Sequence, residues 1–411
     1  MTSTGTTANG TTATGTRRVL VVNAGSSSLK YQLVDPDSGA SDATGLIERI
    51  GLPAGRVRHS CASGTHAHET TVPDHVRAME LLRTAFAEHG PDLSEVELVA
   101  VGHRVVHGGA DFSEPVVVTP AVVDAVRRLI PLAPLHNPGN LQGIEVAQQV
   151  FPDVPQVAVF DTAFHQTMPP AASTYAVPQS WREQYRVRRY GFHGTSHAFV
   201  SRRVADLLGR PLEDVATIVL HLGNGASATA VDGGRSVDTS MGLTPLEGLV
   251  MGTRPGDVDP GLPRHLAEVA GLSVEDYDRA LSKESGLLGL TGSADMRDVE
   301  RRMSEGDTDA RLAFDVVVHR LLHYVGAYAA VLGRLDAVVF TAGIGEHSPL
   351  VRAAVVERLA GFGVRLDAAA NEAAHGEALI STPESSVAVW VVPTNEEFEI
   401  ARQAADLVAR G

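Results

Sequence analysis

The chain of 411 residues contains a single cysteine, Cys61. One cysteine excludes an intrachain disulfide and a metal site built from several thiolates, and it fits a protein of the reducing cytoplasm. No run of about 18 apolar residues occurs, which excludes a helix that spans a membrane. Basic tracts are missing too, and the formal net charge is −15. Nucleic acid and anionic membrane surfaces are therefore not expected partners.

Several signature motifs are also absent. The sequence has no G-x-x-x-x-G-K-[ST], which excludes a P-loop enzyme, and no G-x-G-x-x-G that opens a helix after a strand, as dinucleotide dehydrogenases require. It has neither H-E-x-x-H nor G-x-S-x-G, the marks of zinc proteases and serine hydrolases. The histidines between residues 59 and 75 show no metal-ligand spacing, so we expect no zinc site there.

Aromatic residues make up only 5% of the sequence, so its cores must consist mainly of Val, Leu, Ala and Ile. With 44% hydrophobic residues in 411, the chain can bury two substantial cores. Two domains are the natural expectation for such a length.

The most informative stretch is RRVLVVNAGSSSLKYQLV, residues 17–34. Residues 19–22 form an apolar run typical of a buried strand, and residues 29–34 alternate as a second strand pairing back on the first. The small residues between them form a Gly/Ser-rich turn. Such a turn suits an anion such as phosphate, although ordinary hairpin loops have the same composition.

Two later segments resemble this unit. TIVLHLGNGASATAV, residues 217–231, repeats the order of strand, glycine-rich turn and alternating strand. VVFTAGIGEHSP, residues 338–349, places an apolar strand before Gly343 and Gly345 and a helix start. Three such units predict two related lobes that close on the phosphates of a nucleotide.

Two motifs carry a family resemblance. NAGSSSLKYQL (residues 23–33) together with YGFHGTSH (residues 190–197) resembles the pair of signature segments of the acetate kinase family. The similarity runs from about Arg18 to the C-terminus. That family belongs to the superfamily of sugar kinases, actin and heat-shock-chaperone ATPases.

The resemblance implies an α/β fold with two duplicated ribonuclease H-like lobes, each a mixed sheet flanked by helices, closing on a nucleotide cleft. We expect residues 17–163 with 398–411 to form the first actin-like ATPase lobe. Residues 164–397 form the second, with the nucleotide site and the dimer surface of a homodimer. Residues 1–16, rich in Thr, Gly and Ala, are expected to be a disordered extension.

The resemblance also implies the roles of single residues. A lone Arg beside glycines is otherwise as easily a surface turn as an anion ligand, and a lone Asp after a strand can simply cap a turn. The implied catalytic residues are Arg104, Asp161, His193 and Arg254, with His193 and Arg254 stabilising the transition state. The implied pocket for the acid consists of Arg104, Val106, Leu135, Phe192 and Pro245.

The implied nucleotide site takes residues from four segments: Lys30; His221, Gly223, Asn224 and Gly225; Asp295, Met296 and Arg297; Gly343, Ile344 and Gly345. Asn23, through water, and Glu396 are implied to hold Mg²⁺, or Mn²⁺ in its place. The chain departs from the family at Gly139, where a second proline is common, and at His347, where the family has Asn. The second departure puts the detail of the nucleotide contact in doubt.

Local patterns predict several helix ends. Thr195 or Ser196 is expected to cap a helix that stops at Gly209, and Thr394 with Glu397 has the spacing of a capping box. Further helices are predicted over residues 75–89, from Pro120 to Pro131, from Asn140, and from Ser348 to near Gly361. The C-terminal helix is expected to pack back on the first lobe.

The sequence therefore predicts reversible, Mg²⁺-dependent phosphoryl transfer from ATP to acetate, giving acetyl phosphate and ADP by direct in-line transfer. Propionate kinases share this mechanism and tend to have a smaller residue than Val106, so Val106 favours acetate weakly. An actin- or chaperone-like ATPase is the alternative from another class. It would share the glycine turns, but it would not need Arg104, Arg254 and His193 beyond the γ-phosphate.

Overall fold

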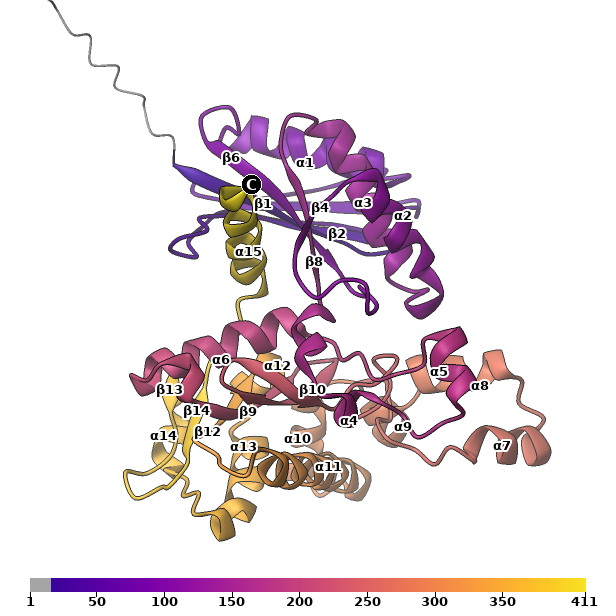
Figure 1. Cartoon of the computed structure of the whole chain (residues 1–411), viewed down its shortest axis with the longest axis vertical. Coiled ribbons are helices and arrows are strands. Elements are labelled where there is room, and N and C mark those ends of the chain that lie inside the picture. Colours follow the sequence, from indigo (N-terminus) through magenta and orange to yellow (C-terminus); the bar gives the residue numbers. More distant parts are fainter. Residues whose placement is uncertain (1–15) are drawn as a thin grey trace, which may run out of the picture.

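The computed structural model describes residues 16–411, so all but Thr16 of the extension expected over residues 1–16 lies outside the described residues. Two lobes are visible, each built around one mixed sheet with helices on both faces (Figure 1). We call the lobe around the eight-stranded sheet the first lobe, and the lobe around the six-stranded sheet the second lobe.

The sheet of the first lobe has the strand order β5-β4-β3-β2-β1-β6-β8-β7. Strands β1 to β5 pair with one another in antiparallel fashion, whereas β6 runs parallel to both β1 and β8. The strands are β1 (Arg17–Ala24), β2 (Ser28–Val34), β3 (Ser41–Glu48), β4 (Gly55–Cys61), β5 (Gly64–Thr70), β6 (Glu97–Val105), β7 (Val116–Val117) and β8 (Gln156–Phe160). The helices are α1 (His75–His89), α2 (Pro120–Arg128), the 3₁₀ turn η1 (Ile130–Leu132), α3 (Asn137–Val150) and α15 (Glu396–Arg410).

Strand β1 shows how the alternation of side chains divides this lobe into layers. Leu20 and Val22 belong to a buried cluster with residues of α1 and α3. Val19 and Val21 point to the opposite face and belong to a cluster with Ile400 and other residues of α15. Because successive side chains of a strand point to opposite faces, one apolar run serves both layers.

The sheet of the second lobe has the order β11-β10-β9-β12-β14-β13. Its strands are β9 (Ala216–Leu222), β10 (Ala226–Asp232), β11 (Arg235–Thr239), β12 (Ala337–Thr341), β13 (Ala378–Leu379) and β14 (Ala388–Val391). Three antiparallel strands are followed by two parallel additions, as in β3-β2-β1-β6-β8 of the first lobe. The predicted duplication of a mixed sheet is therefore present in the structure.

The remaining elements belong to the second lobe and to its junction with the first. They are η2 (Ala163–Thr167), α4 (Pro170–Ser173), α5 (Gln179–Tyr185), α6 (Gly194–Leu208), η3 (Leu212–Asp214), α7 (Leu262–Ala270), α8 (Val274–Lys283), α9 (Gly286–Thr291), α10 (Met296–Ser304), α11 (Thr308–Leu332), α12 (Ala342–His347), α13 (Pro349–Val356), η4 (Glu357–Phe362) and α14 (Ala368–Glu372).

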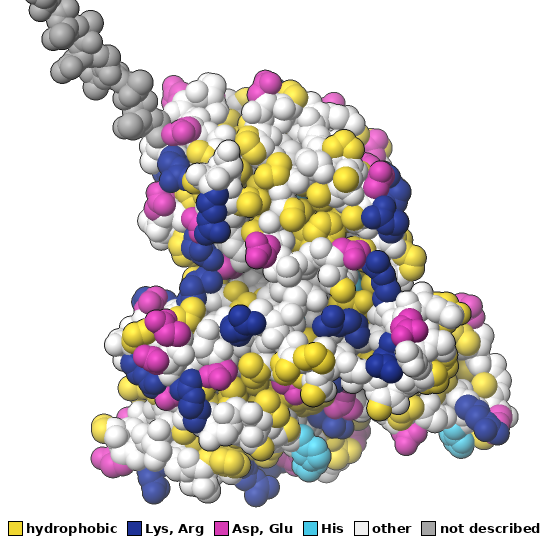
Figure 2. Space-filling model, viewed as in Figure 1, with side chains coloured by type: hydrophobic (Ala, Val, Ile, Leu, Met, Phe, Trp, Pro, Cys, Tyr) yellow, Lys and Arg dark blue, Asp and Glu magenta, His cyan; other side chains and the backbone are white. Residues whose placement is uncertain are grey.

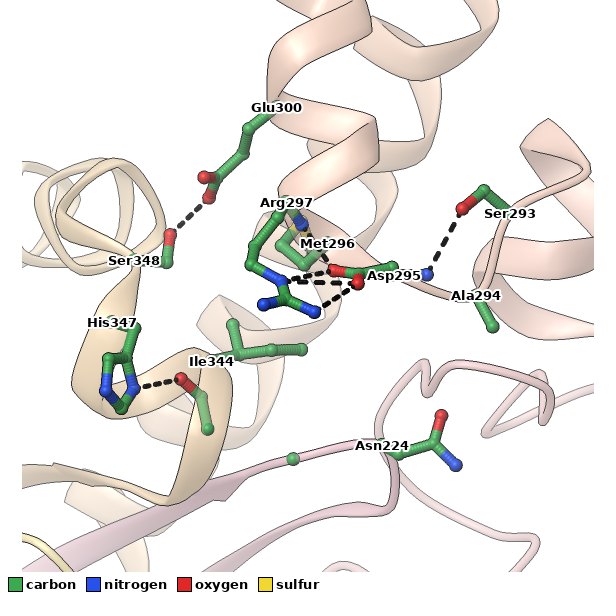
Figure 3. Close-up of a pocket in the computed structure, with 12 residues that line it drawn as sticks. Asn224, Ser293, Ala294, Asp295, Met296, Arg297, Glu300, Ile344, His347 and Ser348 are labelled. Carbon is green, nitrogen blue, oxygen red and sulfur yellow. Dashed lines mark hydrogen bonds and ion pairs between the residues drawn. The ribbon is translucent and has the colours of Figure 1, made fainter.

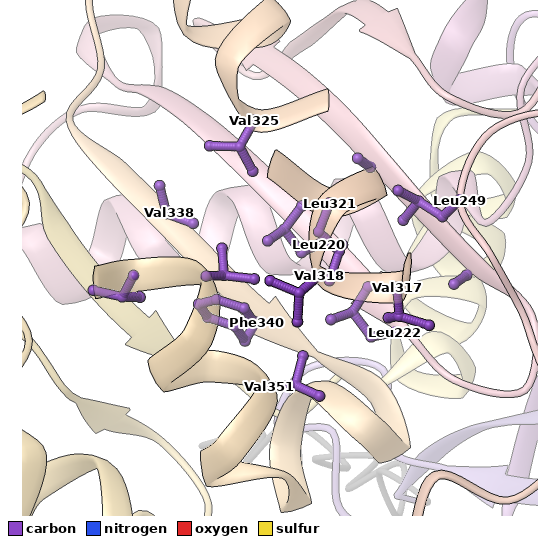
Figure 4. Close-up of a cluster of buried hydrophobic side chains, with 14 of the residues drawn as sticks. Leu220, Leu222, Leu249, Val317, Val318, Leu321, Val325, Val338, Phe340 and Val351 are labelled. Atoms are coloured by element: carbon purple, nitrogen blue, oxygen red, sulfur yellow. The ribbon is translucent and has the colours of Figure 1, made fainter. Parts of the chain in front are cut away.

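The second sheet is also packed on both faces. Leu220 and Phe340 meet α11 through Val318 and Leu321 (Figure 4). Val219, one residue away from Leu220, points to the other face and belongs to a cluster with residues of α6. Both sheets are thus buried on two sides, which fixes the strand ends where the functional residues lie.

The chain crosses from the first lobe to the second after β8 and returns between β14 and α15, so that α15 lies beside the first sheet (Figure 1). The molecule narrows between the lobes, with Lys and Arg side chains along the narrowing (Figure 2). The buried Glu399 of α15 is paired with Arg202 of α6 and with Arg402. The return of the C-terminal helix to the first lobe is confirmed, whereas the exact domain limits stay a prediction.

Two predicted helix caps are wrong. His193, not Thr195 or Ser196, precedes α6, and it adopts the left-handed conformation with φ 57° and ψ 26°. Asn395, not Thr394, caps α15, because its Oδ1 accepts a hydrogen bond of 3.0 Å from Phe398 N. In both cases the hydroxyls expected at the cap make tertiary hydrogen bonds in the cleft instead, which nearby sequence does not reveal.

Other boundaries differ less. Helix α1 ends before Gly90 and α6 before Gly209, as predicted. Helix α2 ends at Arg128, three residues before Pro131, which lies in the 3₁₀ turn η1. Helix α3 begins at Asn137 rather than Asn140. Gly343 and Gly345 lie inside the short helix α12 rather than in a turn ahead of a helix.

Among the described helices, none combines the length and the hydropathy that crossing a membrane requires.

Candidate active site

Arg104 and Asp161 form a paired centre at the ends of two parallel strands. Arg104 lies near the end of β6, and Asp161 directly follows β8, its neighbour in the sheet. The guanidinium donates from Nε to Asp161 Oδ1 at 3.0 Å and from Nη2 to Oδ2 at 2.8 Å. This two-point contact fixes the plane of the arginine, as a lysine would not.

Glu396 brings a second carboxylate to this centre from the first residue of α15. Its Oε2 lies 3.8 Å from Arg104 Nη2 and accepts a hydrogen bond of 3.2 Å from Thr195 of the second lobe. Burial raises the pKa of Glu396, but Arg104, then His221 and Thr195, outweigh burial and lower it. Burial lowers the pKa of Arg104, but the negative charges of Asp161 and Glu396 outweigh burial and raise it. Both groups stay charged.

Arg254 has a different environment. It lies in the long segment between β11 and α7, and its Nη1 donates to the backbone oxygen of Pro245 at 2.8 Å. Within residues 16–411 no carboxylate lies within ion-pair distance of it. Burial without a compensating charge lowers the pKa of Arg254. Such a cation favours the arrival of an anionic ligand.

His193 and His221 stack on one another beside Arg254, with ring centroids 4.1 Å apart. A Cβ atom added to Gly225 would lie 3.5 Å from His193 Nε2 and 3.4 Å from Arg254 Nη2. The open side of this glycine therefore faces both groups. Burial, followed by the nearby His221 and His197, holds the pKa of His193 well below its ordinary value. His193 is thus a neutral imidazole.

The residues predicted to form the pocket for the acid are only partly enclosed. Val106 packs against the large cluster of the second lobe, which includes the buried Phe192. Pro245 is tied to Arg254 through its backbone oxygen. Leu135, in contrast, is 54% exposed, so this side of the site is open.

A cavity of about 690 Å³ opens in the second lobe, and seven residues predicted for the nucleotide line it (Figure 3). These are Gly223, Asn224, Asp295, Met296, Arg297, Gly343 and Ile344. The volume is of the size usual for ligand pockets. Asp295 and Arg297 pair with each other at its rim, with Nη2 and Oδ2 2.6 Å apart.

Four other residues predicted for the nucleotide do not line this cavity. His221 and Gly225 lie beside it, at the stacked imidazoles and Arg254. Gly345 is buried within α12. Lys30 pairs with Glu397, so the structure gives it a carboxylate partner rather than a place in the cavity.

His347, the departure noted in the sequence, does line the cavity. Its Nδ1 lies 3.0 Å from the backbone oxygen of Gly343, one turn earlier in α12 (Figure 3). Gly139, the other departure, has a packing reason, because a Cβ atom there would lie 2.6 Å from the backbone of Gly25. In this chain, the glycine lets α3 approach the first hairpin turn.

A divalent cation fits the donors in the cleft in a limited way. Within the described part of the chain, no group of three or more His, Cys, Asp or Glu is arranged to hold a metal. Glu396 Oε2 accepts from Thr195, whereas its Oε1 makes no hydrogen bond or ion pair with residues 16–411. Mg²⁺ is commonly held by one or two carboxylates, waters and substrate phosphates, so a cage of protein ligands is not needed.

Sequence reasoning missed several residues of this site. Asn140 Nδ2 donates to Ala24 O at 2.7 Å, and its Oδ1 accepts from Val106 N at 3.0 Å. It thus ties the first hairpin to Val106, which is predicted for the acid pocket. Ser227 Oγ lies 2.9 Å from His193 Nδ1. His136, near Arg104 and Arg254, has a pKa lowered first by burial and then by these charges. The sequence predicts a place in the pocket for its neighbour Leu135 and no role for His136.

Comparison with known proteins gives the site its family. The model of the acetokinase family matches residues 18–402. The chain belongs to the acetokinase family. It is 59% identical over 394 residues to an acetate kinase of Leifsonia xyli, with 96% of this chain and 99% of the relative covered. The family predicted from the two motifs is confirmed, and so is a phosphotransferase.

Solved structures of the family agree with the fold. The acetate kinase of Porphyromonas gingivalis matches with a TM-score of 0.89 at 43% identity, covering 93% of this chain and 98% of that one. A propionate kinase of Francisella tularensis matches with a TM-score of 0.88 at 41% identity, covering 94% and 98%. The predicted fold class is confirmed by both. Because the two scores nearly coincide, the fold does not by itself choose between the acids.

Proposed function

We propose that this chain catalyses reversible phosphoryl transfer between ATP and acetate, forming acetyl phosphate and ADP. The observation that carries the proposal is the partly buried Arg254, which has no carboxylate partner among residues 16–411. It lies beside His193 at the open side of Gly225, one residue from Asn224 of the cavity. A γ-phosphate extending from the cavity would reach these donors. The relatives named acetate kinase support acetate as the acid.

In the proposed reaction, a carboxylate oxygen of acetate attacks the γ-phosphorus of ATP. A new O–P bond forms as the bond to the bridging oxygen of ADP breaks, and the charge spreads over the equatorial oxygens. Such a transition state needs alignment and charge stabilisation rather than a covalent intermediate. Arg104 and Arg254 bracket the transferred group and the acetate carboxylate, and His193 donates a hydrogen bond to an equatorial oxygen.

Asp161 acts in this scheme by holding Arg104 through both carboxylate oxygens. Asn23, through water, and Glu396 would hold Mg²⁺, which when bound offsets the negative charge of the phosphates. Mn²⁺ would serve the same donors. The cavity residues hold the nucleoside, with Asp295 and Arg297 near adenine and ribose.

We also propose that Val106, Leu135, Phe192 and Pro245 contact the methyl group of acetate. Val106 is the residue that would limit the pocket on the side of the first lobe. A homodimer formed through the second lobe and a location in the cytoplasm complete the proposal. The single cysteine supports the location.

The test is an ADP-release assay with Mg²⁺ and ATP, run with acetate, propionate, butyrate or no acid. We expect turnover to require an acid and kcat/KM to be highest with acetate. A higher kcat/KM with propionate would favour the related propionate kinase activity with the same mechanism. ADP release without acid would contradict the proposal and favour an actin-like ATPase.

A further inference from the structure

Ser227 occupies an unusual position between two histidines. It lies on β10 with no exposed surface. Its Oγ is 2.9 Å from Nδ1 of His193 and 2.7 Å from Nε2 of His197. Both distances are those of hydrogen bonds, yet a hydroxyl has only one proton to donate. Among residues 16–411, Ser227 Oγ has no other hydrogen-bond partner, so its proton points to one of the two rings unless it is buried without an acceptor. That ring accepts from Ser227, and the other ring donates to it.

The surroundings of His197 decide between the two arrangements. Its Nδ1 is buried and has no hydrogen-bond partner among residues 16–411. If Ser227 donated to His197 Nε2, the proton of the neutral ring would sit on this Nδ1 and be buried without an acceptor. Unpaired buried N–H groups are rarer in proteins than unpaired acceptors. The arrangement with Nε2–H on His197 is therefore favoured, and Ser227 donates to His193.

This order of protons determines which nitrogen of His193 faces the cleft as a donor. With Nδ1 accepting from Ser227, the single proton of the neutral ring is on Nε2. That atom makes no hydrogen bond to the described residues, and it faces Gly225 beside Arg254. A bare lone pair at this position would repel a phosphoryl oxygen, whereas an N–H attracts it.

The stacked neighbour His221 is held in the same way. Thr394 Oγ1 donates to Ser196 Oγ at 2.8 Å, and Ser196 Oγ lies 2.8 Å from His221 Nδ1. A Ser196 hydroxyl that accepts from Thr394 has its own proton free for His221 Nδ1. Ser227 and Ser196 thus hold the two stacked imidazoles at Nδ1, and the Nε2 atoms of both rings face the turn of Gly223 and Gly225.

We propose that Ser227 and His197 are positioning residues that fix His193 in the Nε2–H tautomer, so that this N–H faces the phosphoryl group. The inference rests on the proposed function, which assigns that contact to His193. It adds that the donor is set by a relay on β10 and α6 rather than by His193 itself.

The direct test is the tautomer of His193, measured by long-range ¹H–¹⁵N NMR on protein labelled at its histidines. The chain has 17 histidines, and the His193 signals are assigned by their loss in His193→Gln. We expect Nε2–H in the wild type, a shift toward Nδ1–H in Ser227→Ala, and retention of Nε2–H in Ser227→Thr, which keeps the hydroxyl. An Nδ1–H tautomer in the wild type would overturn the proposal.

Kinetics supply the second readout. Ser227→Ala should lower kcat by about 10- to 100-fold, less than the roughly 10²- to 10³-fold typical for removal of a donor. The KM for ATP should change little. Ser201→Ala removes another buried hydroxyl, one that bonds only to Ala198 O within α6, and is the matched control. It should leave kcat and tautomer unchanged.

A double-mutant cycle separates positioning from a structural effect. Gln at position 193 places an amide donor near Nε2 and has no tautomers, so adding Ser227→Ala to His193→Gln should cost no further kcat. Equal losses in both backgrounds would overturn the proposal. A tautomer shift in Ser227→Ala with unchanged kcat would uphold the relay and instead remove His193 from the proposed function.

Discussion

Arg104 and Arg254 face the same cleft but are held in opposite ways. Arg104 is fixed by Asp161 at two points and has Glu396 nearby. Among the described residues, the one hydrogen bond that the Arg254 side chain makes goes to the backbone oxygen of Pro245. The pKa of Arg104 is raised by its carboxylates after the opposing effect of burial, and that of Arg254 is lowered by burial. The first arginine is therefore arranged before substrate binds, and the second gains its counter-charge from the substrate.

The largest effect should come from Arg254. Replacing it by Ala should lower kcat by on the order of 10³-fold, the loss of a charge that stabilises the transition state. The free energy of unfolding should stay unchanged or rise, because a buried cation without a partner is removed. Chemical denaturation and the ADP-release assay measure the two quantities. A stability loss parallel to the activity loss would mean that Arg254 is structural.

Asp161→Asn tests the other arginine, because Asp161 is the residue that holds Arg104 in place. It leaves Arg104 with a neutral partner of the same shape and should lower kcat by about 100-fold through misplacement. It should also destabilise the protein by about 1–3 kcal/mol, since Arg104 keeps 22% of its side chain exposed and Glu396 nearby. Loss of activity with full stability would show that the clamp does not support the fold.

Val106→Ala sharpens the comparison, because Val106 lies two residues after Arg104 and not near the phosphates. Removing its methyl groups should raise kcat/KM for propionate relative to acetate by about 10-fold, within the range for one methylene. The KM for ATP should not change. Val117→Ala, at a side chain that is 45% exposed in the same lobe, is the control. An unchanged ratio would remove Val106 from the pocket.

The last prediction concerns how stability depends on pH through two buried histidines, one near Arg104 and one near His193. His103, next to Arg104, and His165, which contacts the backbone oxygen of Phe192 before His193, each have their pKa lowered by burial to about 4 from 6.5. Above pH 6.5 both histidines are neutral in the folded and in the unfolded chain, so they do not make stability depend on pH. Between pH 6.5 and 4 the unfolded chain binds protons that the folded chain does not, so stability falls as pH falls.

Each histidine should contribute up to one proton to this slope, about 1.4 kcal/mol per pH unit. Denaturation of His103→Gln and of His165→Gln across this range measures each contribution, and the slope is the readout rather than the stability itself. Equal reductions would show that the two sides are desolvated alike. An unchanged slope in either variant would mean that its imidazole titrates in the folded state.

Much of the fold was predictable from the sequence. Strands β1, β2, β9 and β10 follow apolar runs and alternation that local side-chain pattern specifies, and their turns contain the expected small residues. The ends of α1 and α6 at Gly90 and Gly209 were also predictable, since both residues have a positive φ, which favours glycine after a helix. These features depend on residues close together in the chain.

The errors and omissions share a different cause. Thr394 was expected to cap its own helix, but its hydroxyl donates to Ser196 of α6. The role of Lys30 at the nucleotide stays a prediction, but spacing did not reveal its pair with Glu397, far away in the sequence. Ser227 of strand β10 could not be singled out, because its partners belong to helix α6 and the residue before it. Spacing in the sequence cannot show which hydroxyl or carboxylate a distant segment brings near. The contacts of Ser227 with His193 and His197 could therefore be found only in the structure.

Helix α15 has a consequence for the order in which the protein is made. Val19, Val21, Val157 and Val159 of the first sheet are covered by Ile400, Ala401 and Ala404 of this helix. During synthesis, the ribosome makes the whole second lobe between these strands and the helix that covers them. One face of the first sheet therefore stays uncovered until α15 has been made, and Glu396 enters the cleft in the same step. The first lobe is thus completed only after the second lobe has been made.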